Sequence, residues 1–171
     1  MEYLFIFLLL STLIIACILV YIASYDKISQ TSKKIDKAQE QIEELLNKKY
    51  SLMCDCYKII KKNIKKKDYL KDFNELKVDK LTSYELNNEL DTTFETMDLI
   101  KDNYKSLNTK EYKKLLNSIY EINENLIASE NFFNKYNNVL IKQLTGVNKI
   151  VANITKIKVR TSYEIKEPTE D

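Results

Sequence analysis

Apolar residues fill the start of the chain without interruption. From residue 3 to residue 22 there is no charged residue, no glycine and no proline. An α-helix of that length rises roughly 30 Å, which matches the hydrocarbon thickness of a bilayer. Its two polar side chains, Ser11 and Thr12, can donate hydrogen bonds to carbonyl groups one turn earlier in the helix. The pattern predicts a transmembrane helix over 3–23, preceded by a short N-terminus at 1–2.

After residue 26 the pattern changes to that of an amphipathic helix. Apolar positions recur about every seven residues over 26–67, at Ile28, Ile35, Ala38, Ile42, Leu45, Leu46, Met53, Cys56, Tyr57, Ile60 and Ile64. This period indicates a long helix that packs against another helix, and it excludes the alternation of a strand. The register from Ile28 onward suggests that the transmembrane helix continues into it.

Two more long helices are predicted further along. Residues 68–82 are less periodic and serve as a connection, with a short helix near 70–77. The sequence from Thr82 to Glu85 has the form of a capping box, in which a Thr side chain and a Glu three residues later cap a helix start reciprocally. It is expected to begin a helix over 83–107. The apolar face predicted for this helix consists of Leu86, Leu90, Phe94, Met97, Ile100, Tyr104 and Leu107.

A second capping box, from Asn108 to Glu111, is expected to begin a third helix over 109–144. Gly146 then stands where a glycine commonly ends a helix, and a short amphipathic helix is predicted within 147–158. Asn125 lies beside the apolar stripe of the third helix, so it is expected to join a hydrogen-bond network inside the bundle.

These elements predict an all-α fold: an N-terminal transmembrane helix followed by an antiparallel bundle of three to four long helices over 26–165. The polar tail at 166–171 is expected to be disordered. Composition agrees, because one glycine and one proline in 171 residues leave the chain almost without turn-forming residues.

Charge and composition narrow the function. The chain has 27 basic and 25 acidic residues and a net charge of +2, so no nucleic-acid partner is expected. It has no histidine, which excludes histidine-based catalytic triads and zinc sites. One glycine cannot form a phosphate-binding loop. No catalytic residue, cofactor or metal is expected, and the protein is predicted not to be an enzyme.

The charges that flank the apolar segment predict its orientation. Only Glu2 and the terminal amine precede it, whereas four lysines follow, at Lys27, Lys33, Lys34 and Lys37. The positive-inside rule therefore places the N-terminus outside the cell membrane and the C-terminal domain in the cytoplasm. The alternative is an exported lipoprotein, because the sequence from Ile14 to Cys17 resembles a lipobox, and Cys17 would then be lipidated. Against it, the apolar run continues six residues beyond Cys17.

A lysine cluster marks the end of the first predicted amphipathic helix, at Lys61, Lys62, Lys65, Lys66 and Lys67. It is a candidate patch for an anionic partner. The other interpretation is a solvated helix end whose positive charge complements the helix dipole. We favour the second, because a straight helix would place these lysines about 60 Å from the membrane.

Two stretches, together with the order of the elements, resemble the bacterial LemA family, and the chain is identified as a diverged member. The matching positions of the first stretch are Ile35, Ala38, Ile42, Leu46, Lys49, Tyr50, Leu52 and Met53. Those of the second are Tyr104, Leu107, Glu124, Asn125 and Ile127. The resemblance implies an antiparallel helical bundle in the cytoplasm, and it implies no enzymatic activity.

The sequence therefore predicts a single-pass membrane protein that binds the bilayer through 3–23 and presents a helical bundle to the cytoplasm. Its expected function is that of a protein-interaction or scaffold module with a protein partner. Two alternatives stay open at this point. One is a membrane-tethered coiled-coil element of the division or envelope machinery, and the other is the exported lipoprotein.

Overall fold

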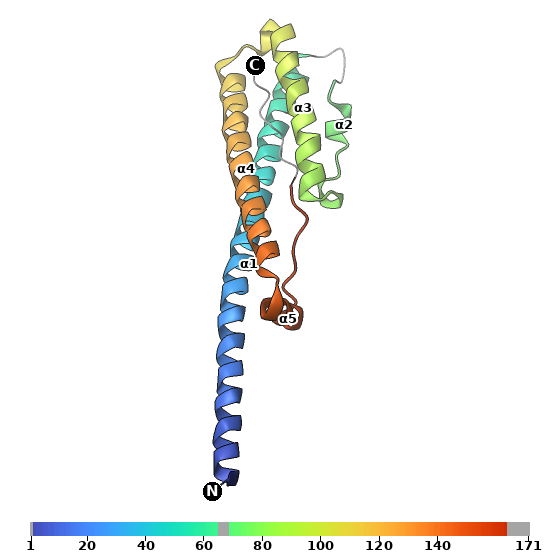
Figure 1. Cartoon of the computed structure of the whole chain (residues 1–171). Coiled ribbons are helices and arrows are strands. Elements are labelled where there is room, and N and C mark those ends of the chain that lie inside the picture. Colours follow the sequence, from blue (N-terminus) through green and yellow to red (C-terminus); the bar gives the residue numbers. More distant parts are fainter. Residues whose placement is uncertain (1, 65–68, 164–171) are drawn as a thin grey trace. The chain divides into compact units, whose positions relative to one another are not determined.

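The computed structural model describes residues 2–64 and 69–163, and every element within them is a helix. The long helices are α1 (Glu2–Asn63), α3 (Ser83–Asn103) and α4 (Lys110–Gln143) (Figure 1). Shorter ones are α2 (Lys71–Asn74), α5 (Gly146–Thr155) and the 3-10 helices η1 (Val78–Lys80) and η2 (Lys105–Leu107). The predicted all-α class is confirmed. The predicted disordered tail at 166–171 lies outside the described residues.

Helix α1 is continuous from Glu2 to Asn63, so the apolar segment and the first amphipathic helix form one element of 62 residues. The described chain divides into two compact units. The first unit comprises residues 2–38 and 132–163, and the second comprises 39–64 and 69–131. Both α1 and α4 contribute a part to each unit, and the units are described in turn.

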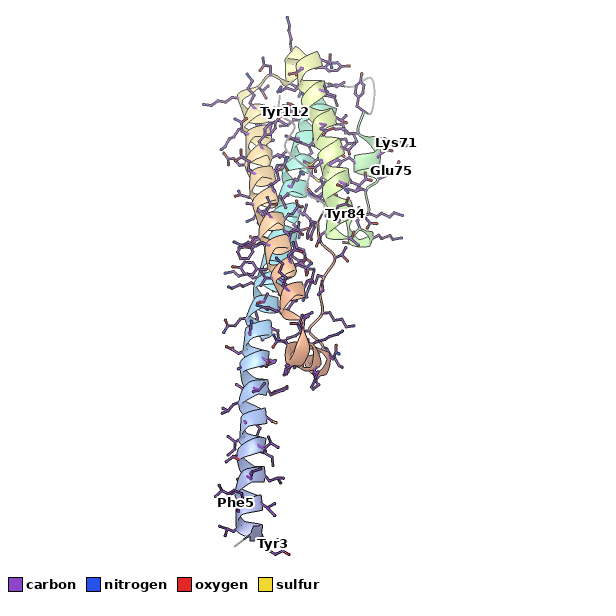
Figure 2. The ribbon with its side chains drawn as sticks, viewed as in Figure 1. Tyr3, Phe5, Lys71, Glu75, Tyr84 and Tyr112 are labelled. Atoms are coloured by element: carbon purple, nitrogen blue, oxygen red, sulfur yellow. The ribbon has the colours of Figure 1, made fainter. Side chains whose placement is uncertain are left out.

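The N-terminal part of the first unit exposes its apolar side chains. No residue from 3 to 22 is buried, and Figure 2 shows Tyr3 and Phe5 projecting from α1 where no other described segment covers them. The hydroxyl groups of Ser11 and Thr12 donate to the carbonyl oxygens of Leu8 and Leu9, each over 2.8 Å, as expected. The helix is long and apolar enough to cross a membrane.

Burial on α1 begins at Ile28 and continues at Thr31, Ile35 and Ala38. The C-terminal part of α4 contributes Phe133, Asn134, Asn137 and Leu140 to the same core. The two helices run antiparallel in this unit (Figure 1), and Lys34 of α1 lies 4.7 Å from the ring centre of Tyr136 of α4. Asp36 also pairs with Arg160, whose backbone binds Asn137.

Two asparagines of α4 hold the extended segment 157–163 in place. The Asn137 side chain donates to the Arg160 carbonyl over 2.6 Å and accepts from the Arg160 amide over 3.1 Å. Asn134 makes the same pair of bonds with Tyr163, over 2.8 Å and 2.9 Å. The Tyr163 ring packs edge-on against Phe133. Each amide thus replaces the partner strand that an extended backbone normally needs.

The second unit packs three helical segments around one core. Its buried side chains are Ile42, Leu46, Lys49, Met53, Cys56 and Ile60 from α1, Leu86, Leu90, Phe94, Met97 and Ile100 from α3, and Tyr112, Leu116, Ile119 and Leu126 from α4. The α3 set is the predicted apolar face. The Tyr112 hydroxyl donates to the Met97 carbonyl over 3.1 Å, so α3 and α4 are also joined by a buried hydrogen bond.

The first predicted capping box is confirmed and the second is wrong. The Glu85 amide donates to the Thr82 hydroxyl over 3.3 Å, and the Thr82 amide donates to the Glu85 carboxylate over 2.8 Å. Helix α4 instead begins one residue later than predicted, since the Tyr112 amide donates to the Thr109 hydroxyl over 3.2 Å. With Thr109 as the cap, the residue three positions later is Tyr112, which has no carboxylate to return the bond.

Gly146 adopts a left-handed backbone with φ +53°, as expected for a glycine at a helix boundary. It is the first residue of α5, whereas α4 already ends at Gln143, so the prediction that Gly146 ends the third helix is wrong. The predicted connection over 68–82 contains α2 and η1, and Phe73 of α2 is buried against Tyr50 and Tyr57 of α1.

Candidate functional site

A buried lysine lies at the centre of the second unit. The side chain of Lys49 is fully buried, at 0% exposure, although its α1 neighbours on the same face are Leu46 and Met53. Its ammonium pairs with the Asp91 carboxylate of α3 and donates to the Asn87 carbonyl oxygen over 3.3 Å. Asn87 in turn donates to the Glu130 carboxylate of α4 over 3.0 Å. We call these four residues the polar network.

The polar network joins all three helical segments of the second unit. Asn87 and Asp91 are four residues apart, so both face Lys49 from the same side of α3. A buried ammonium is costly unless it is paired and hydrogen-bonded. Sliding α1 by one turn would separate Lys49 from Asp91, and the network therefore favours one register of α1 against α3.

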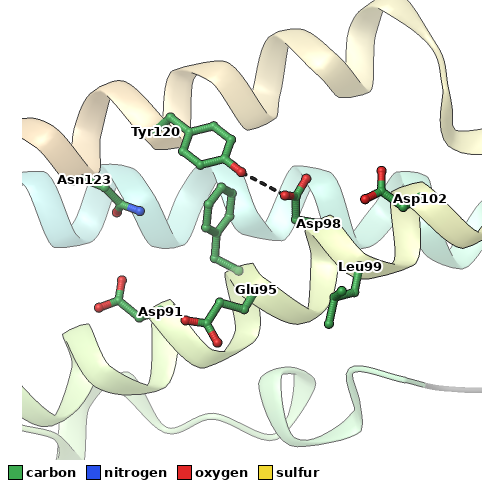
Figure 3. A pocket seen from close by; sticks show the side chains of 8 residues that line it. Asp91, Glu95, Asp98, Leu99, Asp102, Tyr120 and Asn123 are labelled. Atoms are coloured by element: carbon green, nitrogen blue, oxygen red, sulfur yellow. Dashed lines mark hydrogen bonds between the residues drawn. The ribbon is translucent and has the colours of Figure 1, made fainter. Parts of the chain in front are cut away.

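An acidic groove of about 520 Å³ begins at the same aspartate and runs along α3 (Figure 3). It is lined by Asp91, Phe94, Glu95, Asp98, Leu99, Asp102, Tyr120 and Asn123. The four carboxylates are spaced by four, three and four residues, which places them on one helix face. Leu99 is 65% exposed among them, and the buried Oδ1 of Asn123 has no hydrogen-bond partner.

Hydrogen bonds keep the Asp98 carboxylate of the groove ionised. Burial raises the pKa of Asp98, but hydrogen bonds from Lys101, over 2.8 Å, and from the Tyr120 hydroxyl, over 2.9 Å, outweigh it and leave that pKa below its usual value. Burial, and then the bond to Asp98, raise the pKa of Tyr120. None of these shifts brings a group toward neutral pH. The groove therefore presents negative charge beside the exposed side chain of Leu99.

The described residues contain no cluster of three His, Cys, Asp or Glu side chains that could hold a metal ion. The Cys56 thiol also shows no sign of activation. Cys56 is buried, and burial, followed by the nearby Asp55 carboxylate, raises its pKa to about 12. Such a thiol is almost entirely protonated at neutral pH and is a poor nucleophile.

The structure does not gather the residues that carry the resemblance into one site. Ile35 and Ala38 belong to the first unit and the others to the second. Within the described chain, the buried members of this set are Ile35, Ala38, Ile42, Leu46, Lys49, Met53 and Leu107. Tyr50, Leu52 and Tyr104 are half-buried, and Glu124, Asn125 and Ile127 are exposed.

The prediction for Asn125 is wrong. Leu126 takes the inward position of this turn of α4, and the residue beside it points about 100° away. Asn125 is exposed and donates to the Glu121 carbonyl of its own helix over 2.9 Å. It therefore has no part in a network inside the bundle.

The candidate anionic-partner patch is only partly described. Lys61 and Lys62 are exposed in the last turn of α1, and Lys61 lies 5.5 Å from the ring centre of Tyr57. Lys65, Lys66 and Lys67 lie outside the described residues. The two described lysines occupy the position at which positive charge complements the helix dipole.

The sequence did not predict the polar network, nor the hydrogen bonds by which Asn134 and Asn137 hold the segment 157–163. The sequence identifies Lys49 only through the family resemblance, although its position between Leu46 and Met53 on the apolar face indicates a buried charge. Asn134 and Asn137 likewise fall three apart within the apolar stripe from Phe133 to Leu140. A polar residue in the inward register of a helix was the available signal in both cases.

Comparison with known proteins adds no relative: no protein-family model matches the chain, and no curated protein and no solved structure matches it. The resemblance to the LemA family therefore stays a prediction that rests on the residues quoted for it. The features of the chain that bear on its function are α1, the polar network and the acidic groove.

Proposed function

We propose that this chain is a single-pass membrane protein whose helical domain binds a protein partner at the cytoplasmic face, as an interaction or scaffold module related to the LemA family. The observation that carries the proposal is the continuity of α1. The same helix exposes apolar side chains over 3–22 and buries them from Ile28 onward. A membrane anchor and a folded domain therefore share one continuous helix, with only about one and a half turns between Ile22 and Ile28.

The charges beyond the apolar segment support the cytoplasmic orientation. Lys27, Lys33, Lys34 and Lys37 are all exposed on α1. Lysines at the end of a transmembrane helix favour the cytoplasmic side. The apolar run also continues six residues beyond Cys17, which favours a retained helix over a lipoprotein signal.

The acidic groove is the surface that we assign to the partner. Its carboxylates surround an exposed leucine, so it suits a protein segment that carries Lys or Arg beside an apolar residue. The packing of three helical segments in the second unit favours such a domain over an open coiled coil.

Photo-crosslinking in native membranes tests the partner. A photoreactive amino acid replaces Leu99 in the groove, and the matched control replaces Ile127, which is similarly apolar and exposed but does not line the groove. We expect a reproducible adduct from position 99 and none from position 127. Absence of any adduct from position 99, or equal adducts from both, would contradict the proposal.

A thiol reagent that cannot cross membranes tests the orientation. Ser51 is exposed on α1, so a Ser51→Cys variant offers a reactive site that the buried Cys56 does not. We expect this cysteine to be labelled in lysed cells and protected in intact ones. Labelling in intact cells would place the domain outside and overturn the cytoplasmic orientation.

A further inference from the structure

Helix α5 carries an apolar face that no described residue covers. Val147, Ile150 and Ile154 lie three and four residues apart on one side of the helix. They are 48%, 60% and 64% exposed, whereas Val151 and Ala152 are buried in the core of the first unit. The helix is therefore apolar both toward the core and toward the solvent.

The register of the first unit places α5 next to the end of the apolar segment. Lys34 of α1 lies beside Tyr136 of α4, and the two helices are antiparallel in this unit (Figure 1). The seven residues from Tyr136 to Gln143 rise roughly 10 Å, which brings the end of α4 level with about residue 27 of α1. Helix α5 follows three residues later, just beyond that end (Figure 1).

The chain around α5 is uniformly basic. Between residues 131 and 163 there is no Asp or Glu, and the basic residues are Lys135, Lys142, Lys149, Lys156, Lys158 and Arg160. Lys149, Lys156 and Lys158 are exposed on or just after α5. An amphipathic helix with exposed apolar and basic residues is the kind of element that binds an anionic lipid surface.

We propose that α5 lies in the interface of the membrane that α1 crosses, with Val147, Ile150 and Ile154 at the boundary of headgroups and acyl chains. The neighbouring lysines bind anionic phospholipid headgroups. This inference rests on the proposed function, because it requires the apolar segment of α1 to be in the bilayer. Two points of attachment, α1 and α5, then fix the tilt of the first unit relative to the membrane plane.

The chain has no tryptophan, so a single substitution supplies a unique fluorescent probe of depth. Ile154→Trp places the probe on the exposed apolar face of α5. The matched control, Asn153→Trp, is also exposed but points about 100° away around the helix. Leu13→Trp reports separately on the apolar segment of α1.

Each full-length variant is reconstituted into vesicles of phosphatidylcholine with phosphatidylglycerol, carrying bromine either near the headgroup or deep in the acyl chains. We expect shallow bromine to quench Ile154→Trp at least about twice as strongly as Asn153→Trp, with a blue-shifted emission. Deep bromine should quench Leu13→Trp most. Vesicles of phosphatidylcholine alone should weaken the quenching of Ile154→Trp and leave that of Leu13→Trp unchanged.

The outcomes separate the two proposals. If Leu13→Trp is not quenched, the proposal that α1 crosses the membrane is itself refuted. If Leu13→Trp is quenched but Ile154→Trp is quenched no more than Asn153→Trp, the anchor stands and the lipid contact of α5 is refuted, which leaves that face to a protein. Equal quenching of Ile154→Trp in both lipid mixtures overturns the assignment to anionic lipid. Ile150→Trp, at a second exposed position, repeats the test independently.

Discussion

Removing the carboxylate of Asp91 should destabilise the second unit far more than removing the charge of Lys49. Lys49 is 0% exposed at its side chain and Asp91 is 22% exposed. Breaking a buried ion pair from one side costs about 3–5 kcal/mol, because the remaining charge stays buried. In Asp91→Ala the charge that stays buried is the Lys49 ammonium, which can still donate a hydrogen bond to the Asn87 oxygen. We therefore expect the free energy of unfolding to fall by about 2–3 kcal/mol.

Replacing Lys49 instead leaves Asp91, the member of the ion pair that is partly exposed to water. In Lys49→Met the core receives an unbranched apolar side chain of similar length, and the remaining Asp91 is partly solvated. We expect the free energy of unfolding of Lys49→Met to fall by about 1 kcal/mol or less. Glu95→Ala serves as the control, since Glu95 is an exposed carboxylate one turn further along the same helix, and it should change stability by less than about 0.5 kcal/mol.

Cys56 provides the assay. It is buried in the core of the second unit and its pKa is raised to about 12, so a thiol reagent modifies it only when that core opens. The full-length chain is studied in detergent micelles with Cys17→Ala and Cys54→Ser, which leave one thiol. A loss of 2–3 kcal/mol predicts labelling about 30 to 150 times faster for Asp91→Ala. Acceleration below about threefold, or a larger effect from Lys49→Met, would refute the reasoning.

Three further predictions concern the cap of α3, the groove and the first residue of α5. Thr82→Ala removes the capping box of α3 and should cost about 1 kcal/mol, seen as labelling of Cys56 roughly five times faster, whereas Thr92→Ala on the exposed face should not accelerate it. Because the pKa of Asp98 is lowered in the folded state, its stabilisation is present above the ordinary value near 3.8 and is lost as the pH falls through the lower folded value. Lowering the pH should therefore reduce the free energy of unfolding more steeply for the wild type than for Asp98→Asn. An equal dependence of the two free energies on pH would contradict this. Gly146→Ala meets no neighbouring atom but forces a side chain into φ +53°, so it should cost about 1 kcal/mol, measured as faster hydrogen exchange of the α5 amides.

Some of the groove could be foreseen in the sequence and some could not. The spacing of Asp91, Glu95, Asp98 and Asp102 already places four carboxylates on one face of a predicted helix. That this face borders a groove depends on Tyr120 and Asn123 of α4, which lie more than 20 residues away from Asp98 in the chain. The lowered pKa of Asp98 depends on the same packing, because one of its hydrogen bonds comes from Tyr120.

The long helices and most of their inward faces were determined by local pattern. An uninterrupted apolar run, a seven-residue period and a capping box each act within one or two turns, so the sequence alone predicted α1, α3 and α4 and the face that α3 buries. The cap of α4 was missed by one residue because Asn108 and Thr109 can both cap a helix. Only backbone geometry chooses between them.

The tertiary structure decided what the inward polar residues do and which apolar residues stay outside. Lys49 finds its partners about 40 residues away, and Asn137 finds Arg160 across the turn that contains α5. The sequence period of α5 marks it as amphipathic, yet packing alone selects Val151 for the core and leaves Ile150 and Ile154 exposed. Helical periodicity specifies which side chains share a face, whereas burial and pairing depend on the segment that packs against it, and that segment is remote in the chain.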